Sequence, residues 1–298
     1  MSDSSAGKLP DLAGRTAIVT GATGGLGFET ARALGAAGAR VVLAVRDLDR
    51  GRDAAARMKR MERMAGPVEV RLLDLADLSS VRRFAADWTG DISLLVNNAG
   101  VVYPPELTRT RDGFEAQFGV NHLGHFALTR LLREHLTGRV VSVSSRFLAS
   151  GLDLDDPNWE RRPYHASRAY NESKLAVLLF TIELQRRLAA AGSTVIATAA
   201  HPGWSATGAL SAGRGLLPAM LRLGTPLLAS SAEAGARPSL YAATADIPGG
   251  TFVGPGIMQM YGAPKPVPTP GVALDSESAR RLWEVSERLT DVSAGDRK

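Results

Sequence analysis

The feature that most constrains the fold is the alternation of short apolar runs with longer stretches of helical periodicity. Seven such runs occur along the chain, in the order TAIVTG, RVVLAV, VEVRLLDL, SLLVNNAG, RVVSVSS, TVIATAAHPG and GTFVGP. Continuous apolar strands separated by helices are typical of a parallel sheet that is buried on both faces. Because crossovers between parallel strands are right-handed, we predict an α/β fold with a doubly wound parallel sheet of about seven strands and helices on both faces.

No linker interrupts this pattern, so we predict an N-terminal extension at residues 1–14 and a single domain at 15–298. Two long connections, 146–169 and 204–230, each follow a strand. Ligands of such sheets bind beyond the carboxyl ends of the strands, which makes these connections candidates for a substrate pocket. Their apolar residues predict a rather apolar substrate, although the same residues could belong to the core or to a contact between two copies. These residues are Leu148, Leu152, Trp159, Trp204, Leu210, Leu216, Leu217 and Met220.

Composition narrows the classes of function. The chain has no cysteine, which excludes disulfides, thiolate metal sites and cysteine nucleophiles, and we expect no metal site. The net charge of +5 is spread among acidic residues, so we expect no nucleic-acid partner. The densest basic stretch, at 57–64, is expected to form a helix with Met58, Met61 and Met64 facing the core.

The sequence also bears on location. No stretch reaches the ~18 uninterrupted apolar residues of a membrane span, and the first 15 residues contain no apolar signal core. We therefore expect a cytoplasmic protein without a membrane span.

A glycine-rich turn, TGATGGLG at residues 20–27, follows the first predicted strand and precedes a helix. Glycines at 21, 25 and 27 permit a tight turn, a close approach of the backbone to a pyrophosphate, and close packing of helix on strand. The helix start offers free N–H groups and the positive end of the helix dipole. The spacing differs from the commoner G-x-G-x-x-G, and a glycine turn without a ligand is the alternative. The position of the turn favours a dinucleotide-binding, Rossmann-type site.

The end of the second predicted strand bears on cofactor choice. An acidic residue there binds the ribose hydroxyls of NAD, whereas an arginine accommodates the 2′-phosphate of NADP. Arg46 occupies this position and Asp47 follows it. We predict a preference for NADP(H), with NAD(H) still open because Asp47 could turn inward.

The stretch YNESK, residues 170–174, places a phenol and an ammonium group four positions apart. On a helix these positions lie on one face, about one turn from each other. An ordinary amphipathic helix with a half-buried tyrosine and a surface lysine explains the five residues equally well. The choice depends on the rest of the chain.

Seven pieces in order resemble the short-chain dehydrogenase/reductase family over nearly the whole length. The glycine-rich turn is followed by Asp74–Leu75, NNAG at 97–100, Asn121 in VNHLGHF, VSS at 143–145, YNESK and HPGWSAT at 201–207. NHLGHF, SKLAVLLFTIELQRRL and the long interval before Tyr170 look like the branch of retinol dehydrogenases and protochlorophyllide reductases. Membrane-bound retinoid enzymes of this branch usually carry an N-terminal anchor. The first residues here show no such segment, so a retinoid substrate is not carried over.

The resemblance implies four catalytic positions. Tyr170 would be the general acid/base, and Lys174 would lower its pKa and hold the nicotinamide ribose. Ser145, rather than Ser144, would position the substrate oxygen, and Asn121 would help to organise a proton relay. The positions that would contact the cofactor are Gly21, Thr23, Gly25, Leu26, Gly27, Arg46, Asp74, Leu75, Asn98, Ala99, Gly100, Tyr170, Lys174, Pro202, Gly203 and Thr207.

Physical chemistry agrees with these roles. A free tyrosine titrates near ~10, and a nearby cation together with the charge of an oxidised nicotinamide stabilises the phenolate. We therefore expect an NADP(H)-dependent oxidoreductase that interconverts a carbonyl and an alcohol on a small molecule. The alternatives are an NADPH-dependent carbon–carbon double-bond reductase and a non-catalytic NADP(H)-sensing protein. His122 and His125 are assigned no catalytic or metal role, and the family allows a homo-oligomer.

Overall fold

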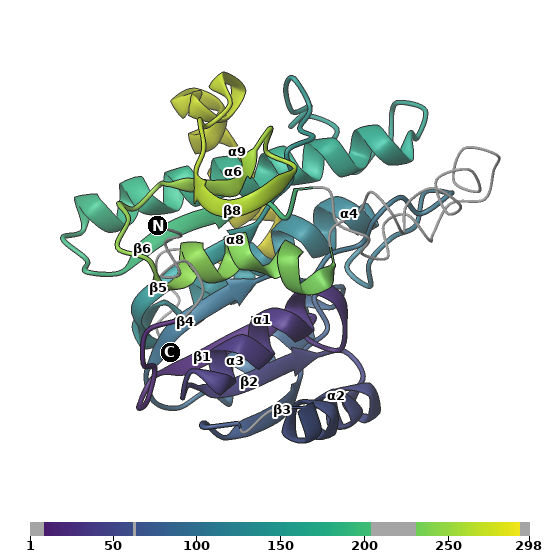
Figure 1. Cartoon of the computed structure of the whole chain (residues 1–298). Helices are drawn as coiled ribbons and strands as arrows, with labels where there is room; N and C mark the ends of the chain where they lie inside the picture. The colour runs from purple at the N-terminus through teal and green to yellow at the C-terminus, as the bar shows by residue number, and fades with distance from the viewer. Residues whose placement is uncertain (1–8, 62–63, 204–230, 293–298) are drawn as a thin grey trace, which may run out of the picture.

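The computed structural model describes residues 9–61, 64–203 and 231–292. It contains an eight-stranded sheet in the order β3-β2-β1-β4-β5-β6-β7-β8 (Figure 1). The strands are β1 (Thr16–Thr20), β2 (Arg40–Val45), β3 (Val68–Leu72), β4 (Ile92–Asn97), β5 (Leu136–Val143), β6 (Ile196–Ala200), β7 (Phe252–Ile257) and β8 (Tyr261–Pro266). Strands β1 to β7 pair in parallel, and β8 pairs antiparallel with β7. The prediction of a doubly wound parallel sheet is confirmed.

Helices cover both faces of this sheet. Their bounds are α1 (Gly25–Ala36), α2 (Leu48–Met61), α3 (Leu78–Ala86), α4 (Ala116–Phe118), α5 (Gly124–Leu131), α6 (Ala166–Ala190), α8 (Ala232–Thr244) and α9 (Ser276–Thr290). A π-helical turn at Gly119–Leu123 joins α4 to α5. The predicted C-terminal helix from about Ser276 is confirmed as α9.

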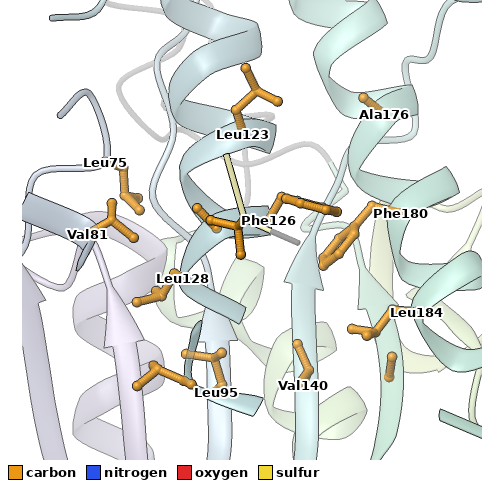
Figure 2. Packing of buried hydrophobic residues seen from close by; sticks show 14 of the residues in the cluster. Leu75, Val81, Leu95, Leu123, Phe126, Leu128, Val140, Ala176, Phe180 and Leu184 are labelled. Atoms are coloured by element: carbon orange, nitrogen blue, oxygen red, sulfur yellow. The ribbon is translucent and has the colours of Figure 1, made fainter. Parts of the chain in front are cut away.

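Two hydrophobic clusters divide the core because successive strand residues point to opposite faces. Ala17 and Val19 of β1 pack with α1, α2 and α8, whereas Ile18 packs with α3, α5, α6 and α9. The second face holds a group of aromatic side chains. The Phe126 and Phe180 rings lie 5.6 Å apart there, between α5 and α6 (Figure 2). This core fixes the carboxyl ends of the strands relative to α5 and α6.

Strand β8 was not among the seven strands predicted from the sequence. Its sequence, YGAPKP, contains Pro264 and Pro266, which have no N–H group to donate to a ladder. Proline is tolerated here because β8 is the last strand at the edge of the sheet. A prediction based on apolar continuity could not find such a strand.

The prediction that Met58, Met61 and Met64 all face the core is partly wrong. Met58 is fully buried, but Met61 is 59% exposed, since α2 ends there. Met64 lies beyond the helix and packs against the cluster beneath α1 and α2. In the described ranges, no helix is long and apolar enough to cross a bilayer.

Candidate active site

The site lies where the strand order reverses, between β1 and β4. In doubly wound sheets the carboxyl ends of such strands border a crevice that binds ligands. The two strand ends are joined directly, because the Thr20 hydroxyl accepts hydrogen bonds from the Asn98 and Ala99 N–H groups at 2.9 Å each. The Asn98 side chain also donates to the Thr20 carbonyl at 2.8 Å. The glycine-rich turn and the loop after β4 therefore form one surface.

The glycine-rich turn has the shape that a dinucleotide requires. Gly21 and Gly25 have φ angles of +68° and +55°, which favour glycine. A Cβ at Gly27 would lie 2.6 Å from the Gly21 carbonyl oxygen, so this glycine allows α1 to approach the turn. Gly24 caps α1 without a side-chain hydrogen bond, and a Cβ there would meet open space. Thr23 and Leu26 flank it and are partly exposed. The open helix start fits a pyrophosphate.

Arg46 and Asp47 follow β2, and both side chains are exposed. The Asp47 carboxylate accepts from the N–H groups of Asp49 and Arg50 at 3.0 and 3.1 Å, which caps the start of α2. Arg46 forms no hydrogen bond or ion pair with the residues that the structure describes. A cation without a partner fits a 2′-phosphate, whereas Asp47 is already engaged.

The other predicted cofactor contacts differ in accessibility. Asp74 is partly exposed after β3, and its carboxylate accepts from the Ala76 N–H at 2.9 Å. Leu75 is only 6% exposed and packs in the core, near Val81 and Leu123 (Figure 2). Its side chain therefore serves packing in the core.

Ser145, Tyr170 and Lys174 meet at the carboxyl end of β5. Ser145 is 8% exposed and forms a side-chain hydrogen bond with Tyr170. The Lys174 ammonium group lies 5.8 Å from the centre of the Tyr170 ring and donates to the Val143 carbonyl at 2.9 Å. Ser144 instead donates to the main-chain carbonyl of Lys174 at 2.8 Å. The two adjacent serines therefore face different partners, and Ser145 is the one that faces the phenol.

Burial dominates the pKa values of both Tyr170 and Lys174. Burial, and secondarily the charge of Tyr103, raise the pKa of Tyr170 to about 12, while the hydrogen bond with Ser145 lowers it in part. Burial lowers the pKa of Lys174 to about 8. The ammonium group lies over the tyrosine ring and donates to a carbonyl, and burial is the largest cause of the raised Tyr170 pKa. The predicted lowering of the Tyr170 pKa is thus not a property of the protein alone.

Asn121 lies in the π-helical turn and is almost fully buried. Its side-chain oxygen accepts from the Val101 N–H at 2.7 Å, and its amide nitrogen donates to the Val101 carbonyl at 3.1 Å. The same nitrogen donates to the Ser173 hydroxyl at 2.9 Å. A Cβ at Gly100 would lie 3.1 Å from the Asn121 side-chain oxygen and 3.8 Å from the Lys174 ammonium group. Asn121, Gly100 and Lys174 are therefore neighbours.

Tyr103 is a site residue that sequence reasoning missed. Its ring centre lies 4.8 Å from that of Tyr170, and its backbone has a φ of +49°, which is uncommon outside glycine. The Gln117 side chain accepts from its N–H at 2.9 Å and stabilises this conformation. Its position three residues after NNAG was the only available signal.

The predicted pocket is described in part. Leu148 and Leu152 pack against the core. Trp159 is only 4% exposed, and the Arg162 guanidinium carbon lies 3.7 Å from the centre of its ring. The segment 204–230, with Trp204, Thr207, Leu210, Leu216, Leu217 and Met220, lies outside the described residues. Pro202 and Gly203 follow β6 and are partly exposed. The first connection thus contributes core residues.

Comparisons with known proteins agree with this geometry. The model of the short chain dehydrogenase family matches residues 15–214. Human retinol dehydrogenase 13 is 43% identical over 299 residues, covering 95% of this chain and 86% of the human protein. The crystal structure of an uncharacterized protein from Mycobacterium paratuberculosis is 49% identical, with a TM-score of 0.83 over 97% of each chain. A metagenomic short-chain oxidoreductase in complex with NADP is 28% identical, with a TM-score of 0.52 over 65% of this chain and 84% of that one. The chain belongs to the short-chain dehydrogenase/reductase family and, within it, to the retinol-dehydrogenase-like branch, as an NAD(P)-dependent oxidoreductase that acts on alcohol and carbonyl groups.

Proposed function

We propose that this oxidoreductase uses NADP(H) in preference to NAD(H) and acts on an apolar alcohol or carbonyl compound. The observation that carries the proposal is the contact of Ser145 with Tyr170 beside buried Lys174, next to an open glycine turn. Unpartnered Arg46 supports the cofactor preference. The substrate class is supported by the Tyr103 ring against Tyr170 and by the retinol named for the human relative.

The residues would share the chemistry as follows. When bound, the nicotinamide supplies or takes up the hydride. Tyr170 donates a proton to the substrate oxygen during carbonyl reduction and accepts it during alcohol oxidation. The Ser145 hydroxyl hydrogen-bonds the same oxygen and stabilises its developing charge.

Lys174 and Asn121 would act on the tyrosine and its surroundings. The ammonium group can exchange its contact with the Val143 carbonyl for the ribose hydroxyls and the phenolate. Because its pKa is about 8, it loses a proton more readily than a free lysine and suits a proton relay. Asn121 holds the loop at Val101 next to this ammonium group.

The cofactor preference is tested by titrating the purified protein with NADPH and NADH, followed by nicotinamide fluorescence. We expect tighter binding of NADPH, and loss of that preference in Arg46→Asp. The expected change is about tenfold or more, since a charge-assisted hydrogen bond contributes about 1.5–3 kcal/mol. Equal affinities in the wild-type protein would refute the preference, and failure to bind either nucleotide would refute the whole proposal.

The catalytic role is tested with Tyr170→Phe, assayed against apolar alcohols, aldehydes, ketones and enones. We expect turnover to fall by about 10² or more, the typical contribution of a general acid, while NADPH still binds. Unchanged turnover would remove Tyr170 from the mechanism. Activity on enones alone would favour double-bond reduction over carbonyl chemistry.

A further inference from the structure

His125 connects two parts of the site that the sequence treats separately. His125 is the second residue of α5 and lies one turn after Asn121. Its side chain is only 4% exposed. Its Nδ1 is 3.0 Å from the Asn121 main-chain oxygen, and its Nε2 is 2.9 Å from the Thr20 hydroxyl. Both ring nitrogens therefore have partners in the buried interior.

The direction of each hydrogen bond follows from the chemistry of the partners. A carbonyl oxygen can only accept, so the proton lies on Nδ1 of His125. Burial lowers the pKa of His125 to about 4, which keeps the ring neutral at pH 7. Nε2 is then an acceptor and receives the Thr20 hydroxyl proton. The Thr20 oxygen keeps its lone pairs for the N–H groups of Asn98 and Ala99.

The far end of the same loop is held by Asn121. Its side chain makes two hydrogen bonds with Val101, while its main-chain oxygen receives the His125 proton. The loop from Asn98 to Val101 is consequently fixed at both ends, and His125 is the connection between the two. Lys174 faces the same space, since its charge contributes to lowering the pKa of His125.

We propose that His125 is a positioning residue that holds the cofactor-lining loop 98–101 in register with the π-helical turn, which presents Asn121. The proposal rests on the proposed function for the identity of the cofactor. His125 touches neither substrate nor cofactor in this role and acts through Thr20 and Asn121. The sequence assigned no catalytic or metal role to His122 or His125, and the positioning role is given to His125 alone.

The neighbouring His122 provides the contrast. Its Nε2 contacts the Ser286 hydroxyl at 2.7 Å, and its Nδ1 has no partner among the described residues. The His122 ring centre lies 5.2 Å from that of Phe118 and 5.9 Å from that of Phe180. The Ser286 hydroxyl also donates to the Leu282 carbonyl at 2.7 Å, so a phenyl ring at 122 leaves that hydroxyl with a partner, and His122→Phe is a matched control for the loss of a buried imidazole.

The first experiment observes the ring directly. In the ¹⁵N-histidine-labelled protein, long-range ¹H–¹⁵N spectra assign the tautomer, with His125→Gln identifying the signal. We expect a neutral His125 protonated on Nδ1 at pH 7. An Nε2-protonated or charged ring would overturn the proposal, because Nε2 would then not accept the Thr20 proton, which would go to the Val96 carbonyl at 3.4 Å instead.

The second experiment separates positioning from packing. His125→Phe fills the space without either hydrogen bond, whereas His125→Gln retains an oxygen that can accept from Thr20. We expect His125→Phe to weaken NADPH binding about tenfold, the equivalent of one net hydrogen bond, and His125→Gln to recover most of the affinity. His122→Phe should bind NADPH as the wild-type protein does.

The outcomes distinguish this proposal from the proposed function. If the wild-type protein binds NADPH and His125→Phe binds it equally well, positioning by His125 is refuted while the enzyme assignment stands. Equal losses in His125→Phe and His125→Gln, or a matching loss in His122→Phe, would show a packing role and also refute it. If the wild-type protein binds neither nucleotide, the proposed function itself fails.

Discussion

Lys174 carries an ammonium group at a buried position, where charge is unfavourable. Burial lowers its pKa from 10.5 to about 8, so the unfolded chain binds this proton more tightly than the folded protein does. Between these two pKa values, stability increases with pH. The group proposed for catalysis therefore destabilises the fold at neutral pH.

Lys174→Met is expected to remove this pH dependence. The stability of the wild-type protein relative to the variant should rise by up to about 3 kcal/mol between pH 7 and pH 10, as the buried amine becomes neutral. Urea unfolding at several pH values measures the difference, and exposed Lys265→Met serves as the control. A difference that does not change with pH would show that the ammonium group is not desolvated.

The sequence predicted which residues are reactive, but it did not predict their burial and their neighbours. Ser145, Tyr170 and Lys174 were predicted by resemblance, and the structure places them together. The spacing of four residues in YNESK does not reveal that burial raises the pKa of Tyr170 in the protein alone, and the lowering expected beside an oxidised nicotinamide stays a prediction. Tyr103 and His125 were missed since their contacts depend on loops and strands that are distant in sequence.

At the scale of elements, the close approach of α1 to the sheet depends on Gly27. A Cβ at this position would lie 2.4 Å from the Asn98 amide nitrogen and 2.6 Å from the Gly21 oxygen. Alanine is normally favoured over glycine in a helix by about 1 kcal/mol. Here the contact with the backbone oxygen should reverse that preference.

Gly27→Ala is predicted to destabilise the protein by about 1–3 kcal/mol, the range for overpacking. NADPH binding should weaken as well, since the helix start moves away from the loop after β4. Urea unfolding and fluorescence titration measure the two effects. Gly24→Ala, where a Cβ meets open space, should change stability by no more than about 0.5 kcal/mol. Equal effects of the two substitutions would contradict the packing argument.

Elements were predictable where burial on both faces makes the sequence continuously apolar. Strands β1, β2 and β4 meet this condition, whereas β8 lies at an edge of the sheet and contains two prolines. The end of α2 at Met61 was missed because the methionine spacing continues beyond the point where the chain leaves the helix. Patterns thus identify core elements better than edges and ends.

The whole molecule contains three buried histidines that are neutral at pH 7. Burial lowers the pKa to about 3 for His122 and to about 4 for both His125 and His201. Each folded-state value lies below the ordinary 6.5, so the unfolded chain binds more protons between pH 6.5 and 4. Stability is therefore lost as pH falls through this window. Paired carboxylates such as Asp156 and Glu183, whose pKa values are lowered, act in the same direction at lower pH.

Acid unfolding should consequently occur above pH 4. Each histidine alone lowers the free energy of unfolding by about 3 kcal/mol or more between pH 6.5 and pH 4. Typical domains have only about 5–15 kcal/mol of stability. His122→Phe isolates one of the three: near pH 5 it should reduce the slope of unfolding free energy against pH by about 1.4 kcal/mol per unit, because one fewer proton is taken up on unfolding. Urea unfolding from pH 7 to pH 5 measures this slope, with the exposed His165→Phe as control. The same slope in His122→Phe as in the wild-type protein would mean that this imidazole is protonated in the fold, and that the acid lability has another source.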